Sequence, residues 1–110
     1  MATKILPVGD AVYNVVVAAN APMLSSDVRP TQPRSTFRIT VSLSAAVKFG
    51  VAVKKNGTSI TTYFKDGAVL PASAVQTFVL GVTSEETYNF VCDGATVQKL
   101  QVDEVLGGVI

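Results

Sequence analysis

Two consecutive segments of this chain alternate apolar and polar side chains with a period of two. The apolar positions are Phe37, Ile39, Val41 and Leu43 in residues 36–43, then Val47, Phe49, Val51 and Val53 in residues 47–54. Such a period places every second side chain on one face of a β-strand, so each segment predicts a strand with one buried face. Asn56-Gly57 follows, and because a type I′ turn needs positive φ at both central residues, this dipeptide predicts a tight hairpin. Gly50 lies on the face opposite to Phe49, where we expect a bulge or a close approach of backbone.

Short strands are also predicted along the rest of the chain. The candidates are residues 11–18, 58–64, 75–82, 87–92 and 96–105, separated by turn signals such as Lys65-Asp66-Gly67 and Asp93-Gly94. Residues 75–82 (VQTFVLGV) are apolar on both faces, which is typical of a strand covered on both sides. No stretch predicts a helix. Seven to eight short strands at this spacing indicate an all-β fold, a two-sheet antiparallel β-sandwich of jelly-roll or immunoglobulin-like type.

The length of the chain fits one domain. We expect residues 1–110 to form a single β-sandwich, since 110 residues lie near the common domain size. Pro22, Pro30 and Pro33 interrupt residues 20–35, so this segment is predicted as an extended arm or loop, as are residues 1–10. Residues 106–110 read as an apolar C-terminal tail.

The balance of apolar and charged residues favours a chain that contacts other subunits. Hydrophobic residues make up 48% of the chain and charged residues 15%, against roughly 25% charged in an average soluble domain. Either the fold buries an unusual share of its side chains, or neighbouring subunits cover part of its surface. The second option suits an assembly. The residues expected to contact a subunit or partner are Pro30, Arg34, Tyr63, Val109 and Ile110.

Charge and hydropathy argue against two partner classes. Nine basic and eight acidic side chains leave a net charge of +1, which gives little long-range attraction for nucleic acid. No apolar run reaches the roughly 18 residues of a membrane-spanning helix. The first residues lack the apolar core of a secretory signal, so we expect the chain to act where it is made or within something assembled there. A lone cysteine, Cys92, agrees with a reducing compartment.

The residue types present leave little room for catalysis. The chain has no histidine, which removes the commonest general base and the commonest metal ligand. Two acidic pairs exist, Glu85-Glu86 and Asp103-Glu104, but neighbours in a strand point to opposite faces, so we expect turn and solvent roles for them. With one Cys and no calcium-loop or phosphate-loop pattern, no metal and no cofactor is expected. An enzyme is the least favoured class.

Three tyrosines are the candidates for a binding face. If its strand is regular, Tyr63 points away from Phe64 and shares a face with Thr61 and Ser59. Tyr13 and Tyr88 complete the set. The preferred interpretation is that each ring covers a sandwich edge while its hydroxyl reaches water, with an assembly contact next.

From Thr36 onward, the chain has a recognisable order of elements. These are the strand TFRITVSL, the hairpin Asn56-Gly57-Thr58, Leu70-Pro71-Ala72 ahead of VQTFVLGV, residues 86–90 (ETYNF) and residues 100–105 (LQVDEV). In this order the chain resembles small β-sandwich proteins of the virions of tailed bacteriophages. The resemblance implies a structural part of the virion, a homo-oligomer with a trimer favoured over a dimer, made in the host cytoplasm and seated on the major capsid protein or other virion proteins.

Two classes of function therefore stay open. The first is a non-enzymatic virion protein, either a capsid decoration (cement) protein that stabilises the outer capsid surface or, alternatively, a tail or baseplate component. In this hypothesis the segment 20–35 and the tail at Val109 and Ile110 clamp neighbouring subunits. The second is a carbohydrate-binding β-sandwich that uses Tyr63, Thr61 and Ser59, with Tyr88 as a further contact.

Overall fold

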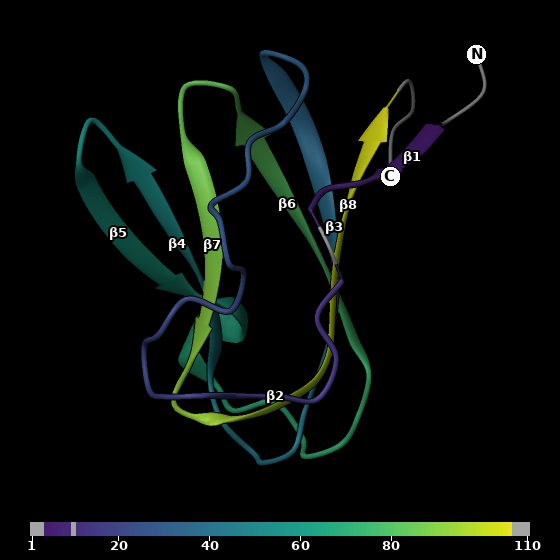
Figure 1. Ribbon diagram of the computed structural model, residues 1–110, viewed down its shortest axis with the longest axis vertical. Coiled ribbons are helices and arrows are strands. Elements are labelled where there is room, and N and C mark those ends of the chain that lie inside the picture. Colours follow the sequence, from purple (N-terminus) through teal and green to yellow (C-terminus); the bar gives the residue numbers. More distant parts are fainter. Residues whose placement is uncertain (1–3, 10, 107–110) are drawn as a thin grey trace.

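The computed structural model describes residues 4–9 and 11–106, and this part of the chain is an all-β sandwich (Figure 1). Two antiparallel sheets pack face to face, as the sequence predicts. A short 3₁₀ turn, η1 (Phe64–Gly67), is the helical element in it, and none of the described helices is long and apolar enough to cross a membrane. The eight strands are β1 (Lys4–Pro7), β2 (Val15–Val17), β3 (Arg34–Leu43), β4 (Phe49–Lys55), β5 (Thr58–Tyr63), β6 (Gln76–Thr83), β7 (Thr87–Cys92) and β8 (Ala95–Leu106).

The larger sheet has the order β1-β8-β3-β6, and β2 also pairs with β8. β1 and β2 lie along successive parts of β8, with Ile5 opposite Val105 and Val16 opposite Thr96. An isolated bridge joins Val12 to Leu100 between them. β1 and β2 therefore act as one interrupted edge strand. The smaller sheet has the order β5-β4-β7.

Residues 20–28 extend the smaller sheet beyond β7. The Met23 amide donates to the Phe90 carbonyl over 2.8 Å, and Val28 and Tyr88 exchange two backbone hydrogen bonds of 2.8 and 2.9 Å. The Asn89 side chain bonds both the amide and the carbonyl of Leu24. The segment predicted as an arm over residues 20–35 is indeed extended and irregular, but it does not project. It packs on its own sheet because its apolar side chains Met23, Leu24 and Val28 are buried there, and its last two residues begin β3.

This arrangement selects the jelly roll from the two predicted topologies. With residues 20–28 counted in the smaller sheet, every connection crosses from one sheet to the other except the β4–β5 hairpin. In an immunoglobulin-like sandwich the last strand pairs with the strand before it. Here β8 lies between β1 and β3, while β7 belongs to the opposite sheet. The chain therefore winds as two interlocked Greek keys.

The core between the sheets follows the predicted alternation. The fully buried side chains include Phe37, Ile39 and Val41 from β3, Leu100 from β8, and Phe49 and Phe90 from the smaller sheet. The Phe49 ring stacks on Phe64, Phe78 and Phe90 with centroid distances of 5.4, 5.9 and 5.8 Å. Phe78 belongs to the larger sheet, so this aromatic cluster joins the two layers.

The prediction that residues 75–82 are covered on both faces is wrong. β6 is the last strand of the larger sheet, and only its inner residues Phe78, Leu80 and Val82 pack on the core. Val79, on the outer face, is 51% exposed, and Val75 just before the strand is 64% exposed. Apolar residues on both faces do not require a second layer, since the outer face stays open where no element lies over it.

Two predictions for the first residues also need correction. Residues 1–10 were expected to be an extended arm, whereas Lys4–Pro7 form β1 on the larger sheet. Residues 11–18 were expected to be one strand, but only Val15–Val17 are assigned to it. Asn14 has a φ of 54°, which interrupts a regular strand. Of the predicted C-terminal tail, Leu106 ends β8, and residues 107–110 lie outside the described residues.

The hairpin and the close approach at Gly50 are as predicted. Asn56 and Gly57 have φ values of 52° and 82°, both in the left-handed region that a type I′ turn needs. Gly50 lies opposite Tyr63. A Cβ atom at Gly50 would come within 2.7 Å of the Thr62 carbonyl oxygen and 2.9 Å of Tyr63 Cδ1. The tyrosine ring therefore covers the space that a larger residue would fill.

We predict that Gly50→Ala lowers the free energy of unfolding by about 1–3 kcal/mol, because the new methyl group overlaps backbone that cannot move freely. Gly81→Ala in β6 is the matched control, since no heavy atom lies within 4 Å of its Cβ position. This control should be neutral or stabilising by roughly 0.5 kcal/mol. Urea unfolding of both variants measures the difference, and equal stabilities would contradict the close approach.

Candidate contact surfaces

The buried carboxylates serve the fold. Asp103 accepts a 3.0 Å hydrogen bond from Arg38 Nη2 on β3 and one of 3.1 Å from Gln101. Glu104 is completely buried, and both of its oxygens accept the Thr31 amide, at 3.0 and 3.1 Å. These two residues point to opposite faces as expected, but the predicted solvent role is wrong for both. Their residue types gave no sign of burial, because the partners come from distant parts of the chain.

Burial acts to raise the pKa of Glu104, but hydrogen bonds oppose it. The Ser35 side chain, the Thr31 backbone and side chain, and the Gln32 backbone favour the charged form, and together they hold the pKa below its ordinary value of 4.5. The carboxylate thereby ties residues 31–35 to the end of β8. Within the described residues, no group of three or more His, Cys, Asp or Glu is placed to hold a metal ion.

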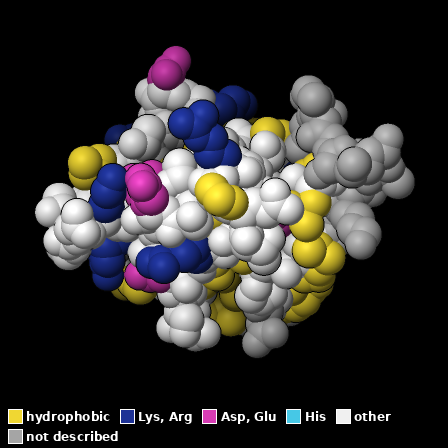
Figure 2. All heavy atoms as spheres, turned by 90° about the horizontal axis from the view of Figure 1, so that it is seen from above, with side chains coloured by type: hydrophobic (Ala, Val, Ile, Leu, Met, Phe, Trp, Pro, Cys, Tyr) yellow, Lys and Arg dark blue, Asp and Glu magenta, His cyan; other side chains and the backbone are white. Residues whose placement is uncertain are grey.

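Basic side chains gather over one side of the molecule. In the end-on view of Figure 2, Lys and Arg lie mainly on the side where β4 and β5 lie in Figure 1. Lys54 and Lys55 at the end of β4 are each 3.5 Å from a carboxylate oxygen, of Asp27 and Glu85 respectively. Both lysines are about half exposed, so these pairs are weak and partly neutralise the local charge.

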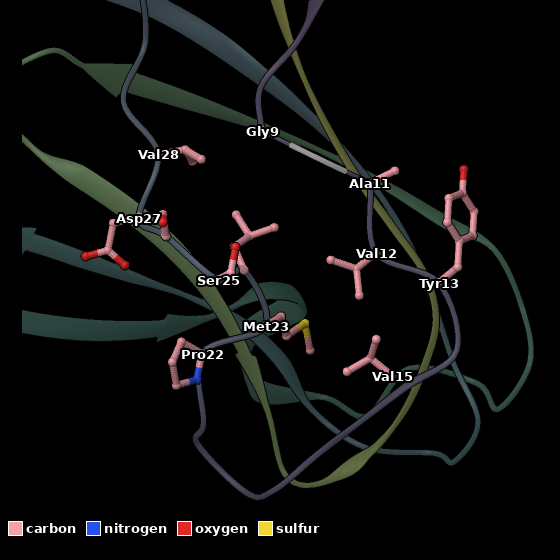
Figure 3. Close-up of a pocket in the computed structure, with 12 residues that line it drawn as sticks. Gly9, Ala11, Val12, Tyr13, Val15, Pro22, Met23, Ser25, Asp27 and Val28 are labelled. Atoms are coloured by element: carbon pink, nitrogen blue, oxygen red, sulfur yellow. The ribbon is translucent and has the colours of Figure 1, made fainter.

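A cleft of about 830 Å³ opens at the edge of the sandwich, with residues 9 and 11–15 on one side and residues 22–28 on the other. Val12, Val15 and Met23 point into it, whereas the Tyr13 ring and the Asp27 carboxylate point away (Figure 3). Asp27 instead accepts a 2.8 Å hydrogen bond from Asn89 Nδ2 and pairs with Lys54. The cleft is therefore suited to apolar groups, and its polar side chains do not converge on one point.

The outer face of the larger sheet presents exposed valines. Val16 on β2 is 79% exposed, and Val79 on β6 is 51% exposed. Gly81, two residues after Val79, adds no side chain to this face. The nearest charge on the same face is Arg38, which lies opposite Val79 and is paired with Asp103. This surface can make contacts through backbone and small apolar side chains.

The residues predicted to contact a partner do not form one surface. Pro30 is buried within its own chain, which leaves its ring little area for a partner. Arg34 is exposed at the start of β3, and Tyr63 ends β5 in the other sheet. Val109 and Ile110 lie outside the described residues. Val75 and Val79, which the sequence predicts to be covered, are exposed and are therefore further candidates for a contact surface.

The three tyrosines differ in their surroundings. Tyr88 is buried, packs edge-on against Phe37 and accepts the Thr83 amide, so it cannot serve as the further sugar contact that the sequence suggested. The Tyr63 ring lies between Gly50 and Lys48, and the Lys48 ammonium is 5.6 Å from the centroid of this ring. The Tyr63 hydroxyl donates a 3.0 Å hydrogen bond to the Asn20 side chain. Tyr13 is exposed beside the cleft.

No protein-family model and no curated protein matches this chain. The outer face of the larger sheet carries the exposed Val16 and Val79, and such apolar surface is suited to contact with other protein chains.

We predict that Glu104→Gln flattens the acid dependence of stability. Because the folded pKa is lowered, the contribution of Glu104 is full above its ordinary pKa of 4.5 and is lost as the pH falls through the lower folded pKa. At neutral pH the variant should lose about 1–3 kcal/mol.

Urea unfolding at pH 7 and pH 3 measures this effect. Glu85→Gln is the control, because the Glu85 side chain is 75% exposed and its ion pair with Lys55 contributes little to stability. If Glu104→Gln kept the full loss of stability between the two pH values, the anchoring role of its carboxylate would be wrong.

Proposed function

We propose that this chain is a non-enzymatic structural protein of a bacteriophage virion, and specifically a capsid decoration protein. It binds the outer capsid surface as a homo-oligomer and stabilises the shell. The localisation of the protein follows from this role, because such a protein is made in the host cytoplasm and is then incorporated into the virion. Two observations support the proposal. Residues 36–105 resemble small virion proteins of tailed bacteriophages, and the sandwich exposes apolar side chains on its outer face.

The observation that carries the proposal is the exposure of apolar side chains on a rigid β-surface. Val16, Val75 and Val79 are more than half exposed, although the fold has a well-filled core. Exposed apolar side chains that lie near one another can mark contacts with other proteins, and Val75 and Val79 lie just before and within β6. A chain with 15% charged residues has few groups to keep such a surface solvated.

The jelly-roll winding supports the same proposal by analogy. This fold occurs in viral capsid domains, and it also occurs in lectins and other binding domains, so it raises the expectation without identifying the partner. The lectin-like use would need an accessible aromatic platform. Tyr88 is buried, and the ring of Tyr63 is flanked by Gly50 and Lys48. Tyr13 is exposed, but among the described residues its ring is not joined by a second exposed tyrosine to form such a platform.

The proposal predicts that the purified protein stabilises capsids of its parent phage that were prepared without it. Bound protein should raise the temperature at which these capsids release DNA or lose their shape, because each added contact must be broken before the shell opens. Differential scanning calorimetry with sedimentation of the bound protein measures both effects.

Capsids that already carry the protein provide a saturated control. Binding to the undecorated capsids alone, with a higher transition temperature, is the expected result. Protein that stays in the supernatant at all concentrations and leaves the transition unchanged would contradict a decoration role. A tail or baseplate role would instead give binding to tails.

A further inference from the structure

We propose that β6 is a self-association edge: it pairs antiparallel with β6 of a second copy of this chain, about a two-fold axis at Val79. This interface forms between two copies of the isolated protein. It can form whether or not the chain binds capsids, since capsid contact can use another face.

The direction of each backbone group in β6 follows from its pairing with β3. The Ser84 amide donates to the Pro33 carbonyl over 3.2 Å, and the register continues from there with Arg34 opposite Thr83. Because bonded and non-bonded pairs alternate in an antiparallel ladder, even-numbered residues of β6 bond to β3. The amide and carbonyl groups of Thr77, Val79 and Gly81 therefore point away from the sheet.

The contacts at Thr83 agree with this assignment. Its amide, which also points away from β3, has no partner on a strand and instead donates to the Tyr88 hydroxyl over 2.9 Å. Its carbonyl accepts the Glu86 amide at 3.4 Å. Within residues 4–9 and 11–106, no such local partner bonds the outward backbone groups of Thr77, Val79 or Gly81. The free part of the edge therefore ends at Gly81.

This free edge is complementary to itself. With Val79 opposite Val79 of the second copy, Thr77 lies opposite Gly81 in both directions, and all three pairs are of the hydrogen-bonded kind. Each such pair exchanges two bonds, so the three pairs satisfy all six outward groups on each strand. A two-fold axis perpendicular to the sheet keeps both outer faces on the same side. The two valines then lie side by side, about 5.5 Å apart at Cα.

The composition of β6 also distinguishes it from β5, the edge strand of the smaller sheet. Natural edge strands are commonly protected by lysine, proline or bulges. β6 (QTFVLGVT) contains no charge and no proline. β5, the edge of the smaller sheet, is flanked by Lys54, Lys55 and Lys65, whose like charges oppose self-pairing. Arg38, next to Val79, is neutralised by Asp103.

The predicted assembly is a two-fold dimer with one continuous sheet, β1-β8-β3-β6 joined to its symmetric copy. This differs from the trimer that the family resemblance implies. The shared ladder covers five residues of each chain, and stable interfaces begin at roughly 1,000 Å² of buried surface. We therefore expect reversible dimers whose fraction rises with protein concentration.

Analytical ultracentrifugation over a concentration series tests the interface. The wild-type chain of 11.5 kDa should shift toward twice that mass. Val79→Lys should weaken dimerisation at least tenfold, because two ammonium groups would meet at the axis. Val16→Lys is the matched control: it makes the same change at an exposed valine of the same sheet, away from β6, and should dimerise like the wild type.

Two further variants fix the register and remain informative if Val79→Lys folds poorly. A mixture of Val79→Lys and Val79→Glu should form dimers that neither forms alone. Val79→Cys should crosslink through the new thiol under mild oxidation, since the expected Cα separation falls in the disulfide range, whereas Val75→Cys should not. Equal loss of dimer in Val16→Lys, crosslinking only at residue 75, a wild-type trimer, or a monomer at every concentration would each overturn the inference. The last two outcomes leave capsid binding to be judged by its own experiment.

Discussion

The pairing of β3 with β8 is the constraint on which the other parts of the sandwich depend. These two strands lie side by side in the middle of the larger sheet, and their inner residues fill the core from Val41 and Leu100 to Phe37. At the end of the ladder, Glu104 binds residues 31–35 and so fixes where the chain enters β3. β1, β2 and β6 can only add to the outside of this pair. The sheet therefore ends in a strand, β6, whose second face and second edge have no partner within the described chain.

This open edge links the fold to the proposed role. The aromatic cluster between the two sheets and a few buried carboxylates, Asp103 and Glu104, hold the sandwich together, and the chain has few other charged side chains. At the β6 edge, unpaired backbone groups and the exposed Val79 can form contacts by hydrogen bonding and close packing. The same features would be a risk of aggregation in a solitary domain. In an assembly, the open β6 edge and its exposed valine can instead be covered by another chain.

The sequence predicts the local parts of this structure well and the non-local parts poorly. The alternation in residues 36–43 and the Asn56-Gly57 turn depend on neighbouring residues, so the strands and the hairpin could be found. Sheet order depends on pairing between distant parts of the chain, so the sequence does not reveal that β6 is an edge strand with an open outer face. The three prolines predict an extended arm over residues 20–35, but the burial of Met23, Leu24 and Val28 against the smaller sheet depends on partners far away in the sequence. Of the predicted contact residues, Pro30 is buried and Arg34 and Tyr63 lie in different sheets, because burial and convergence are properties of the fold.

The central claim is that this protein works by contact within a larger particle. Electron cryomicroscopy of purified particles of the parent phage tests this claim most directly, because the sandwich can be fitted into the density without any assumption about its partner. The account predicts density for this fold on the outer surface of the capsid. Particles that contain no copy of the chain would contradict it.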